Sequence, residues 1–356
     1  MRITVVTETY YPAVDATTTT VKATVDRLVD LGHEVRLVAP APGLGDYRGC
    51  RVDRVGALER PGAQVRASLE AFRPDVVHVD SPGTLGRKAL KHARRLGVPS
   101  LVVQQDALPV PVLDRWRTRV AERADRVLVT AAWSVERLAE ASIDAGLWLP
   151  GVDTAAFTPA LRDPWLHDRW ARARSASGPL VVVGYVGGLH QRHGVRRLAG
   201  LARVPGIRPV LVGDGSQRDW LAARLPGAKL TGALGPGDLA VAMASLDLLV
   251  HPGEEETCCH ALREAGASGV PVVAPRSGGA REVVRPLETG LLHAAGDPHG
   301  LARAVAVVAG DPRRALLGAR GRELALERSW TQAVDELLEQ HLVPLATRRT
   351  TAPAVR

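Results

Sequence analysis

Cysteine and aromatic residues are scarce in this sequence. Only three cysteines occur, Cys50, Cys258 and Cys259, and two of them are adjacent. An odd number with this spacing is a poor disulfide framework, so we expect a reduced, cytoplasmic chain. Aromatic residues make up 4% of the chain, whereas 46% of its residues are hydrophobic. Aliphatic side chains must therefore fill most of the core.

Long apolar runs are missing, and acidic residues are outnumbered. No stretch is long enough to span a bilayer, and the start MRITVVTETYYP lacks the basic and apolar regions of a signal peptide. Asp and Glu number 38 against 46 Lys and Arg, a net charge of +8. This charge suits nucleic acid, an anionic membrane surface or phosphate-bearing small molecules. Nucleic acid is the weakest of the three, because no aromatic residues interleave the basic ones.

The 356 residues exceed what one compact core usually accommodates. Valine-rich runs alternate with amphipathic stretches, a pattern typical of parallel sheets covered by helices on both faces. Pro150, Gly151 and Pro159 interrupt this rhythm and indicate a connection between two α/β domains. We expect domains at residues 1–160 and 161–329, a C-terminal helix at 330–345 and a flexible tail at 346–356.

The segment from Glu256 to Glu264 is the first candidate for chemistry. It follows a predicted buried strand, so we expect Glu256 on a loop and the next residues, Thr257, Cys258, Cys259 and His260, at the start of a helix. Backbone N–H groups at a helix N-terminus bind phosphate, and a carboxylate at Glu264 suits ribose hydroxyls. A solvated acidic loop before an ordinary surface helix fits the same residues.

Two further strand-end segments of the second half are candidates for ligand contact. Gly187 and Gly188 follow a strong apolar run, and the nearby Arg192 and His193 suit phosphate. Turns at two other strand ends could receive a nucleobase; they contain Gly213, Thr231 and Gly232. Plain βα turns and a solvated basic helix explain these segments as well.

In the first half, polar residues follow three predicted strands. Asp15, Ala16 and Thr17 open the first helix, where the threonine run also offers an N-cap. Asp80 and Gln105 follow two later strands and would line an acceptor pocket. The basic segment 87–95 is either a solvated helix face or a contact for an anionic membrane. No cluster has metal-ligand spacing, so no metal site is predicted.

Several blocks carry a resemblance to a known family, in the same order as in that family. They are TVVTETYYPAVDATTTTV, LGHEVRLVAP, RPDVVHVDSP, ADRVLVTAAWSVERL, LWLPGVDTAAFTP, LVGDGSQRDWLAARLPGAKLTGAL, EETCCHALREAGASGVPVVAPRSGG and LETGLLHAAGD. With these blocks the chain resembles family 4 of the retaining glycosyltransferases, and in particular the bacterial GDP-mannose-dependent α-mannosyltransferases. The resemblance implies the GT-B fold, two Rossmann-like domains with parallel sheets facing across a cleft.

The resemblance also implies roles for individual residues. Glu256 would contact the transferred sugar, Glu264 the ribose, and the helix start at Cys258–His260 the diphosphate. Gln105 stands where the family has histidine or glutamine in its acceptor loop. Three positions depart from the family, which usually has arginine at Gly188, lysine at His193 and glycine at Ala16.

The predicted function is retaining transfer of a hexosyl unit from a nucleoside-diphosphate sugar to a hydroxyl acceptor. The acceptor would be a glycolipid or the sugar of a secondary metabolite, and neither a cofactor nor a metal is expected. Glu256, His193 and Gln105 are the predicted catalytic residues. The alternative is a catalytically impaired relative that binds a sugar nucleotide or a partner, because the missing cations normally neutralise the leaving diphosphate.

Overall fold

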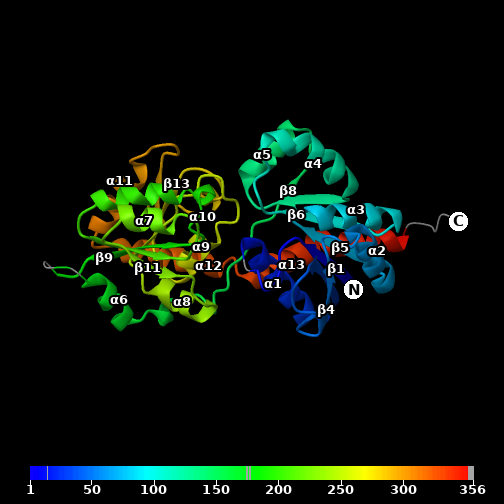
Figure 1. Cartoon of the computed structure of the whole chain (residues 1–356), viewed down its shortest axis with the longest axis horizontal. Coiled ribbons are helices and arrows are strands. Elements are labelled where there is room, and N and C mark those ends of the chain that lie inside the picture. Colours follow the sequence, from blue (N-terminus) through cyan, green and yellow to red (C-terminus); the bar gives the residue numbers. More distant parts are fainter. Residues whose placement is uncertain (14, 174, 176–177, 352–356) are drawn as a thin grey trace. The chain divides into compact units, whose positions relative to one another are not determined.

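The structure is a computed structural model that describes residues 1–13, 15–173, 175 and 178–351 (Figure 1). The chain divides into two compact units. Unit 1 comprises Met1–Pro150 together with Trp330–Arg356, and unit 2 comprises Gly151–Ser329. Each unit is an α/β fold with its own sheet and its own hydrophobic core.

Unit 1 contains an eight-stranded sheet in the order β3-β4-β2-β1-β5-β6-β7-β8. All neighbouring strands run parallel except β3 and β4, which are antiparallel. The sheet order reverses direction beside the first strand, where open α/β sheets bind ligands at their carboxyl ends. The strands are β1 (Arg2–Thr7), β2 (Glu34–Pro40), β3 (Asp46–Tyr47), β4 (Cys50–Val55), β5 (Val76–Asp80), β6 (Ser100–Gln104), β7 (Arg126–Val129) and β8 (Gly146–Leu147).

Helices pack against this sheet and enclose two separate apolar clusters. One cluster joins the sheet to α1 and α13, and the other joins it to α2, α3, α4 and α5. Valines and leucines dominate both clusters, as the low aromatic content requires. The helices are α1 (Ala16–Asp30), α2 (Pro61–Phe72), α3 (Thr84–Arg95), α4 (Leu113–Arg119), α5 (Ala132–Glu140), α13 (Trp330–Leu337) and α14 (Val343–Thr351).

The C-terminal helices belong to unit 1, where α13 lies beside α1 (Figure 1). Arg27 donates two hydrogen bonds to Asp335, at 2.7 and 2.8 Å. The buried Trp148 indole donates to the Ala333 carbonyl at 2.8 Å. The structure differs from the predicted flexible tail at 346–356, because α14 continues to Thr351 and buries Ala346 in the core. The remaining predicted tail, 352–356, lies outside the described residues.

Unit 2 contains a six-stranded parallel sheet in the order β11-β10-β9-β12-β13-β14. Strand β9 lies at its centre, with glycine at Gly184 because a Cβ there would clash with Leu246 at 2.2 Å. The strands are β9 (Val181–Val186), β10 (Ile207–Val212), β11 (Lys229–Gly232), β12 (Leu248–Val250), β13 (Val272–Pro275) and β14 (Gly290–His293).

Both faces of this second sheet are covered, and each face has its own apolar cluster. After β9 the chain forms the 3₁₀ segments Gln191–His193 and Val195–Arg203 where the sequence suggested a regular helix. The α-helices are α6 (Pro164–Ala171), α7 (Arg218–Arg224), α8 (Pro236–Ala244), α9 (His260–Ala267), α10 (Ala280–Val283), α11 (Gly300–Gly310) and α12 (Arg314–Leu326).

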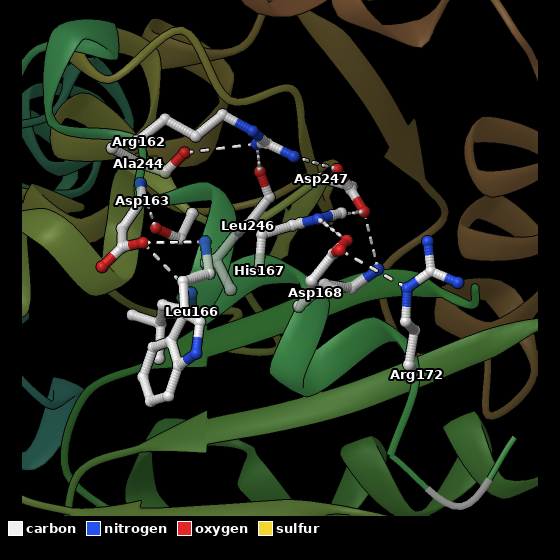
Figure 2. A network of polar contacts seen from close by, with 12 residues as sticks. Arg162, Asp163, Leu166, His167, Asp168, Arg172, Ala244, Leu246 and Asp247 are labelled. Atoms are coloured by element: carbon white, nitrogen blue, oxygen red, sulfur yellow. Dashed lines mark hydrogen bonds and ion pairs between the residues drawn. The ribbon is translucent and has the colours of Figure 1, made fainter.

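A polar network fixes the start of unit 2 to its sheet (Figure 2). Asp247 accepts hydrogen bonds from Arg162 at 2.8 Å, from His167 at 2.9 Å and from the Val182 amide at 2.9 Å. Burial opposes ionisation of Asp247, but these three bonds outweigh burial and lower the pKa of the carboxyl.

The boundary between the units falls at residue 150, ten residues before the boundary expected from the sequence. The reason is that Arg322 donates to the carbonyl groups of Thr154 and Phe157, at 3.0 and 2.9 Å, and so fastens the connection to unit 2. Among the described residues, no helix has the length and apolar character needed to cross a bilayer.

Candidate functional site

The loop between β12 and α9 carries the main cluster of polar side chains in unit 2. His251 directly follows β12 and is buried, Glu256 is half-buried, and α9 begins at His260. Cys259 caps the helix in the left-handed conformation, with a φ of 48°. The backbone dipoles of α9 place partial positive charge at its N-terminus, which favours an anion there.

The Glu256 carboxylate lies between two histidines. His193 Nδ1 is 2.9 Å from Glu256 Oε1, and His251 Nε2 is 3.5 Å from Glu256 Oε2. Burial alone would raise the pKa of Glu256, but the neighbouring histidines outweigh burial and lower it. The carboxylate is therefore ionised at neutral pH. The hydrogen bond to His193 holds its orientation, and His251 lies nearby without a hydrogen bond to it.

Backbone contacts and one ion pair hold the loop between β12 and α9 in place. The Gly279 amide donates to the Glu256 carbonyl at 2.7 Å. A Cβ at Gly279 would lie 1.8 Å from the Thr257 carbonyl oxygen, so only glycine fits there. Arg197 forms a 2.8 Å ion pair with Glu254. The loop is thus a fixed support for Glu256, and Thr257, Cys258 and Cys259 are buried beneath it.

Glu264 lies in the second turn of α9. Burial raises the pKa of its carboxyl from the ordinary 4.5 to about 7. Within the described parts of the chain, no ion pair joins Glu264 to a basic side chain. Hydroxyl groups that donate hydrogen bonds to a buried carboxyl stabilise its charged form, and a ribose offers such hydroxyl groups.

The glycine loop after β9 approaches a neighbouring turn closely. Gly187 and Gly213 have φ values of 148° and 135°, and a Cβ at Gly213 would lie 1.9 Å from the Gly187 carbonyl oxygen. The Gly213 amide donates to the Gly232 carbonyl at 2.9 Å. The Thr231 hydroxyl donates to the same carbonyl at 2.8 Å, so its proton takes part in a hydrogen bond within the protein. Gly187, Gly213, Thr231 and Gly232 therefore lie together at the carboxyl edge of the sheet.

Few cations surround Gly188, where the family usually has arginine. A Cβ at Gly188 would lie 3.1 Å from His190 and 3.7 Å from His193. Arg192 Nε is 3.2 Å from His193 Nε2. Arg196 instead donates to Gln217 at 2.8 Å and stacks on Trp220. His190 and His193 are therefore the basic side chains that lie next to Gly188, and Arg192 contacts His193.

In unit 1, Asp80 and Gln105 meet at the ends of the adjacent strands β5 and β6. Gln105 Nε2 donates to Asp80 Oδ1 at 2.5 Å, and Thr20 of α1 donates to Gln105 Oε1 at 2.8 Å. Burial raises the pKa of Asp80 to about 8. The neighbouring His78 is a core histidine, since burial lowers its pKa to about 4.

Asp15 rather than a threonine caps α1. Its carboxylate accepts from the Thr18 amide at 2.8 Å, and Ala16 and Thr17 form the first turn of the helix. Asp15 also contributes to the raised pKa of Asp80, so the two carboxyl groups lie near each other. Asp15 thus has a structural task besides any contact with an acceptor.

A basic pocket lies elsewhere on unit 1. It has a volume of about 340 Å³ and is lined by Thr84, Arg87, Lys88, Lys91, Arg119 and Arg123. These residues come from α3 and from the region around the end of α4. No acidic residue contributes to its lining, so the pocket favours anions.

Comparison with known proteins assigns the fold and the chemistry. Residues 16–150 match the family described as "Glycosyl transferase 4-like domain", and residues 181–311 match "Glycosyl transferases group 1". The chain belongs to the group 1 glycosyltransferases. It is 37% identical to a GDP-mannose-dependent alpha-mannosyltransferase of Mycobacterium tuberculosis, over 99% of both chains. It is 38% identical to the enzyme of the same name from Mycolicibacterium smegmatis, over 98% of this chain and 99% of that one.

A solved structure confirms the fold of this glycosyltransferase. Anabaena HepE, crystallised with UDP and glucose, has a TM-score of 0.80 and 18% identity, over 96% of this chain and 100% of that one. The predicted GT-B architecture of two Rossmann-like domains is confirmed. The glycosyltransferase moves a glycosyl unit from a nucleotide sugar, and the alternative of an impaired relative is not favoured.

Sequence reasoning did not single out several residues of this glycosyltransferase that surround Glu256. His251 and Gly279 are the most important of them. Arg197 was considered only as a cation for phosphate, whereas in the structure it supports the loop through Glu254. A histidine directly after a buried strand, at a strand's carboxyl end, was the available signal for His251. Gly279 comes from a distant turn, and local sequence carries no sign of its contact.

Proposed function

We propose that this glycosyltransferase moves mannose from GDP-mannose to a hydroxyl group of a lipid-linked acceptor, with retention of anomeric configuration. The observation that carries the proposal is the ionised Glu256, held between His193 and His251 beside the N-terminus of α9. The names of the mycobacterial relatives support GDP-mannose as the donor.

In this proposal, unit 2 binds the donor. Glu256 orients the sugar, and Glu264 accepts hydrogen bonds from the ribose. The start of α9, at Cys258–His260, holds the diphosphate through backbone N–H groups. The glycine loop admits the sugar nucleotide closely, and the base rests against the turns; the residues concerned are Gly187, Gly188, Gly213, Thr231 and Gly232.

Unit 1 supplies the acceptor side. Gln105 and Asp80 position the acceptor hydroxyl, and the turn at Asp15, Ala16 and Thr17 borders it. The hydroxyl oxygen attacks the anomeric carbon on the face that the diphosphate leaves. The bond from that carbon to the diphosphate oxygen breaks as the new glycosidic bond forms, and the departing oxygen takes the acceptor proton. No metal ion or other cofactor takes part.

His193 compensates for the missing lysine. Its Nδ1 faces Glu256, and in this structure its Nε2 accepts a hydrogen bond from Arg192 Nε. When Nε2 takes a proton and the Arg192 guanidinium turns away from it, His193 becomes a cation that Glu256 holds beside the glycine loop, and Arg192 adds a second positive charge nearby. A donor aimed at a developing oxyanion contributes about 2.7–4 kcal/mol to transition-state stabilisation. His193 supplies this contribution in our proposal.

A thermal-shift series with GDP, UDP, ADP and dTDP tests the donor. A ligand at a hundred times its dissociation constant stabilises a protein by about 2.7 kcal/mol. We expect GDP to raise the unfolding temperature most. The substitution Glu264→Gln should reduce that shift, whereas Glu255→Gln, at an exposed residue of the loop before α9, should preserve it. A larger shift with another nucleotide would overturn the choice of GDP-mannose.

For the acceptor, we propose that the enzyme works on the cytoplasmic face of an anionic membrane. The observation is the basic pocket on α3, where five cations gather without an acidic residue. Each lysine or arginine near an anionic surface contributes about 1 kcal/mol. The pocket then brings the acceptor side of unit 1 to lipid-linked substrates.

Co-sedimentation with vesicles tests this contact. The wild type should bind phosphatidylglycerol vesicles at low salt, bind less at high salt, and ignore phosphatidylcholine vesicles. Reversing the charges of Arg87, Lys88 and Lys91 should weaken binding at least about a hundredfold. A control reverses three exposed arginines of unit 2, Arg203, Arg281 and Arg313. Equal loss in both variants, or no binding by the wild type, would contradict membrane docking.

A further inference from the structure

Three side chains around Glu256 form a cluster of nitrogen, oxygen and sulfur atoms. A ring nitrogen of His251, a carboxylate oxygen of Glu256 and Cys259 Sγ all lie within 4.8 Å of one another. His251 directly follows β12, Glu256 lies on the loop, and Cys259 caps α9. The fold thus brings together three potential metal ligands that the sequence does not place at a recognisable spacing.

Two members of the cluster are buried and point to an occupant. His251 is 4% exposed and Cys259 is 3% exposed. In the described chain, His251 Nε2 has no hydrogen-bond partner, although Glu256 Oε2 lies 3.5 Å away. A buried polar atom that makes no hydrogen bond costs about 1–3 kcal/mol and calls for an explanation. An ion coordinated by this nitrogen would remove that cost.

The chemistry of these ligands selects the kind of ion. Imidazole, carboxylate and thiolate together suit Zn²⁺, whereas Mg²⁺ and Ca²⁺ prefer oxygen ligands alone. Zinc bonds of about 2.0–2.3 Å place tetrahedral ligand atoms roughly 3.3–3.8 Å apart. The nitrogen–oxygen pair, at 3.5 Å, already lies in this range, and every pair in the cluster lies within about 1 Å of its upper end. Glu256 is 31% exposed at its side chain and leaves a path for the ion and for a water as fourth ligand.

We propose that His251, Glu256 and Cys259 form a binding site for a thiophilic divalent cation such as Zn²⁺, which withholds Glu256 from the sugar donor while it is bound. A Zn–S bond replaces the S–H bond of Cys259, and the thiol proton is released to solvent. His251 Nε2 donates its lone pair, Glu256 Oε2 is the third ligand, and Oε1 stays with His193. The ion inhibits transfer and is not a cofactor; this inhibitory part rests on the proposed role of Glu256.

Cobalt binding tests the site without reference to activity. Co²⁺ added to the untagged, chelator-treated full-length protein should produce a thiolate-to-cobalt charge-transfer band that saturates at one ion per chain. Cys259→Ser should abolish the band, and Cys258→Ser should retain it, because the neighbouring thiol is buried outside the cluster. Absence of the band in the wild type, or its survival in Cys259→Ser, would refute the site.

A second variant keeps this test decisive if Cys259→Ser folds poorly. His251→Gln retains the thiol and removes the imidazole, so the band should appear only at a higher cobalt concentration. Outer partners of metal ligands contribute roughly 10–100-fold to affinity, and a direct ligand should contribute at least as much. Unchanged cobalt affinity in His251→Gln would overturn the proposal.

Zinc inhibition tests the competition with the donor. At equal concentrations of zinc and GDP-mannose, the wild type should lose a larger fraction of its transfer rate than Cys259→Ser. Zinc bound to the donor diphosphate affects both proteins equally, so the difference reports on the protein site. Equal fractional inhibition would refute the inhibitory role. If no transfer occurs at all, the proposed function fails, and the cobalt spectrum still decides on the metal site.

Discussion

Replacing Glu264 by glutamine should stabilise the ligand-free protein and weaken its affinity for GDP. Burial raises the pKa of Glu264 from 4.5 to about 7. Between these values the carboxyl ionises in the unfolded chain while it stays protonated in the folded one, so stability falls as the pH rises through this window. At about 1.4 kcal/mol per pKa unit, the loss above pH 7 is about 3 kcal/mol. Partial exposure of the side chain makes this an upper bound.

Thermal unfolding of the wild type and of Glu264→Gln at two pH values checks this prediction. The variant should unfold several degrees higher at pH 8 and nearly at the same temperature at pH 5, since 1 kcal/mol corresponds to roughly 2–4 °C in a domain of this size. Its affinity for GDP should fall about 10–100-fold, as for a lost hydrogen bond to a charged group. Glu255→Gln is the matched control and should change neither quantity. An unchanged unfolding temperature at pH 8, or full GDP affinity, would refute the reasoning.

Three further predictions concern single contacts. His193→Ala should lower the transfer rate by about 10²–10³-fold. His193→Lys should retain activity and extend it to higher pH, because the pKa of a lysine is ordinarily about four units above that of a histidine. A pH–rate profile that is the same in wild type and His193→Lys would contradict this. Gly279→Ala should displace the Glu256 loop and abolish GDP binding in a thermal-shift assay, whereas Gly227→Ala, with open space around it, should retain binding. Asp247→Asn should destabilise unit 2 by about 1.5–3 kcal/mol near pH 7. The difference in stability from the wild type should shrink as the pH falls through the lowered pKa of Asp247. Denaturant unfolding of both proteins at pH 7 and pH 3 measures this difference.

Alternating apolar and amphipathic segments were enough to predict two parallel α/β domains. Strands such as β5 (VVHVD) and β9 (VVVGYV) are short and rich in valine, a pattern that identifies buried strands well. The boundary at residue 150 was not predictable, because it depends on bonds from Arg322 to carbonyl groups far away in the sequence. The helix α14 was missed because its first turn is held by Leu345 and Ala346, which are buried in the apolar cluster that includes α1, whereas its own sequence is largely polar.

The candidate site, like the fold, could be predicted from the sequence only in part. The loop with Glu256 was predictable because it directly follows a buried strand, and the local sequence contains the start of α9. The partners of Glu256 were harder to find: His193 was predicted as a catalytic residue and as a cation for phosphate, but not as a partner of Glu256, and His251 was not a candidate at all. Their contacts with one carboxylate depend on how β9 and β12 lie side by side in the sheet.

The most direct test of the central claim is turnover of GDP-mannose. The purified protein is incubated with GDP-mannose and a lipid extract, and both GDP release and a mass increase of one hexose on an acceptor are measured. Our account predicts both for the wild type, and loss of both for Glu256→Ala, while Glu255→Ala retains them. A wild type that binds GDP yet neither releases it from GDP-mannose nor modifies an acceptor, or a Glu256→Ala variant with full activity, would contradict the account.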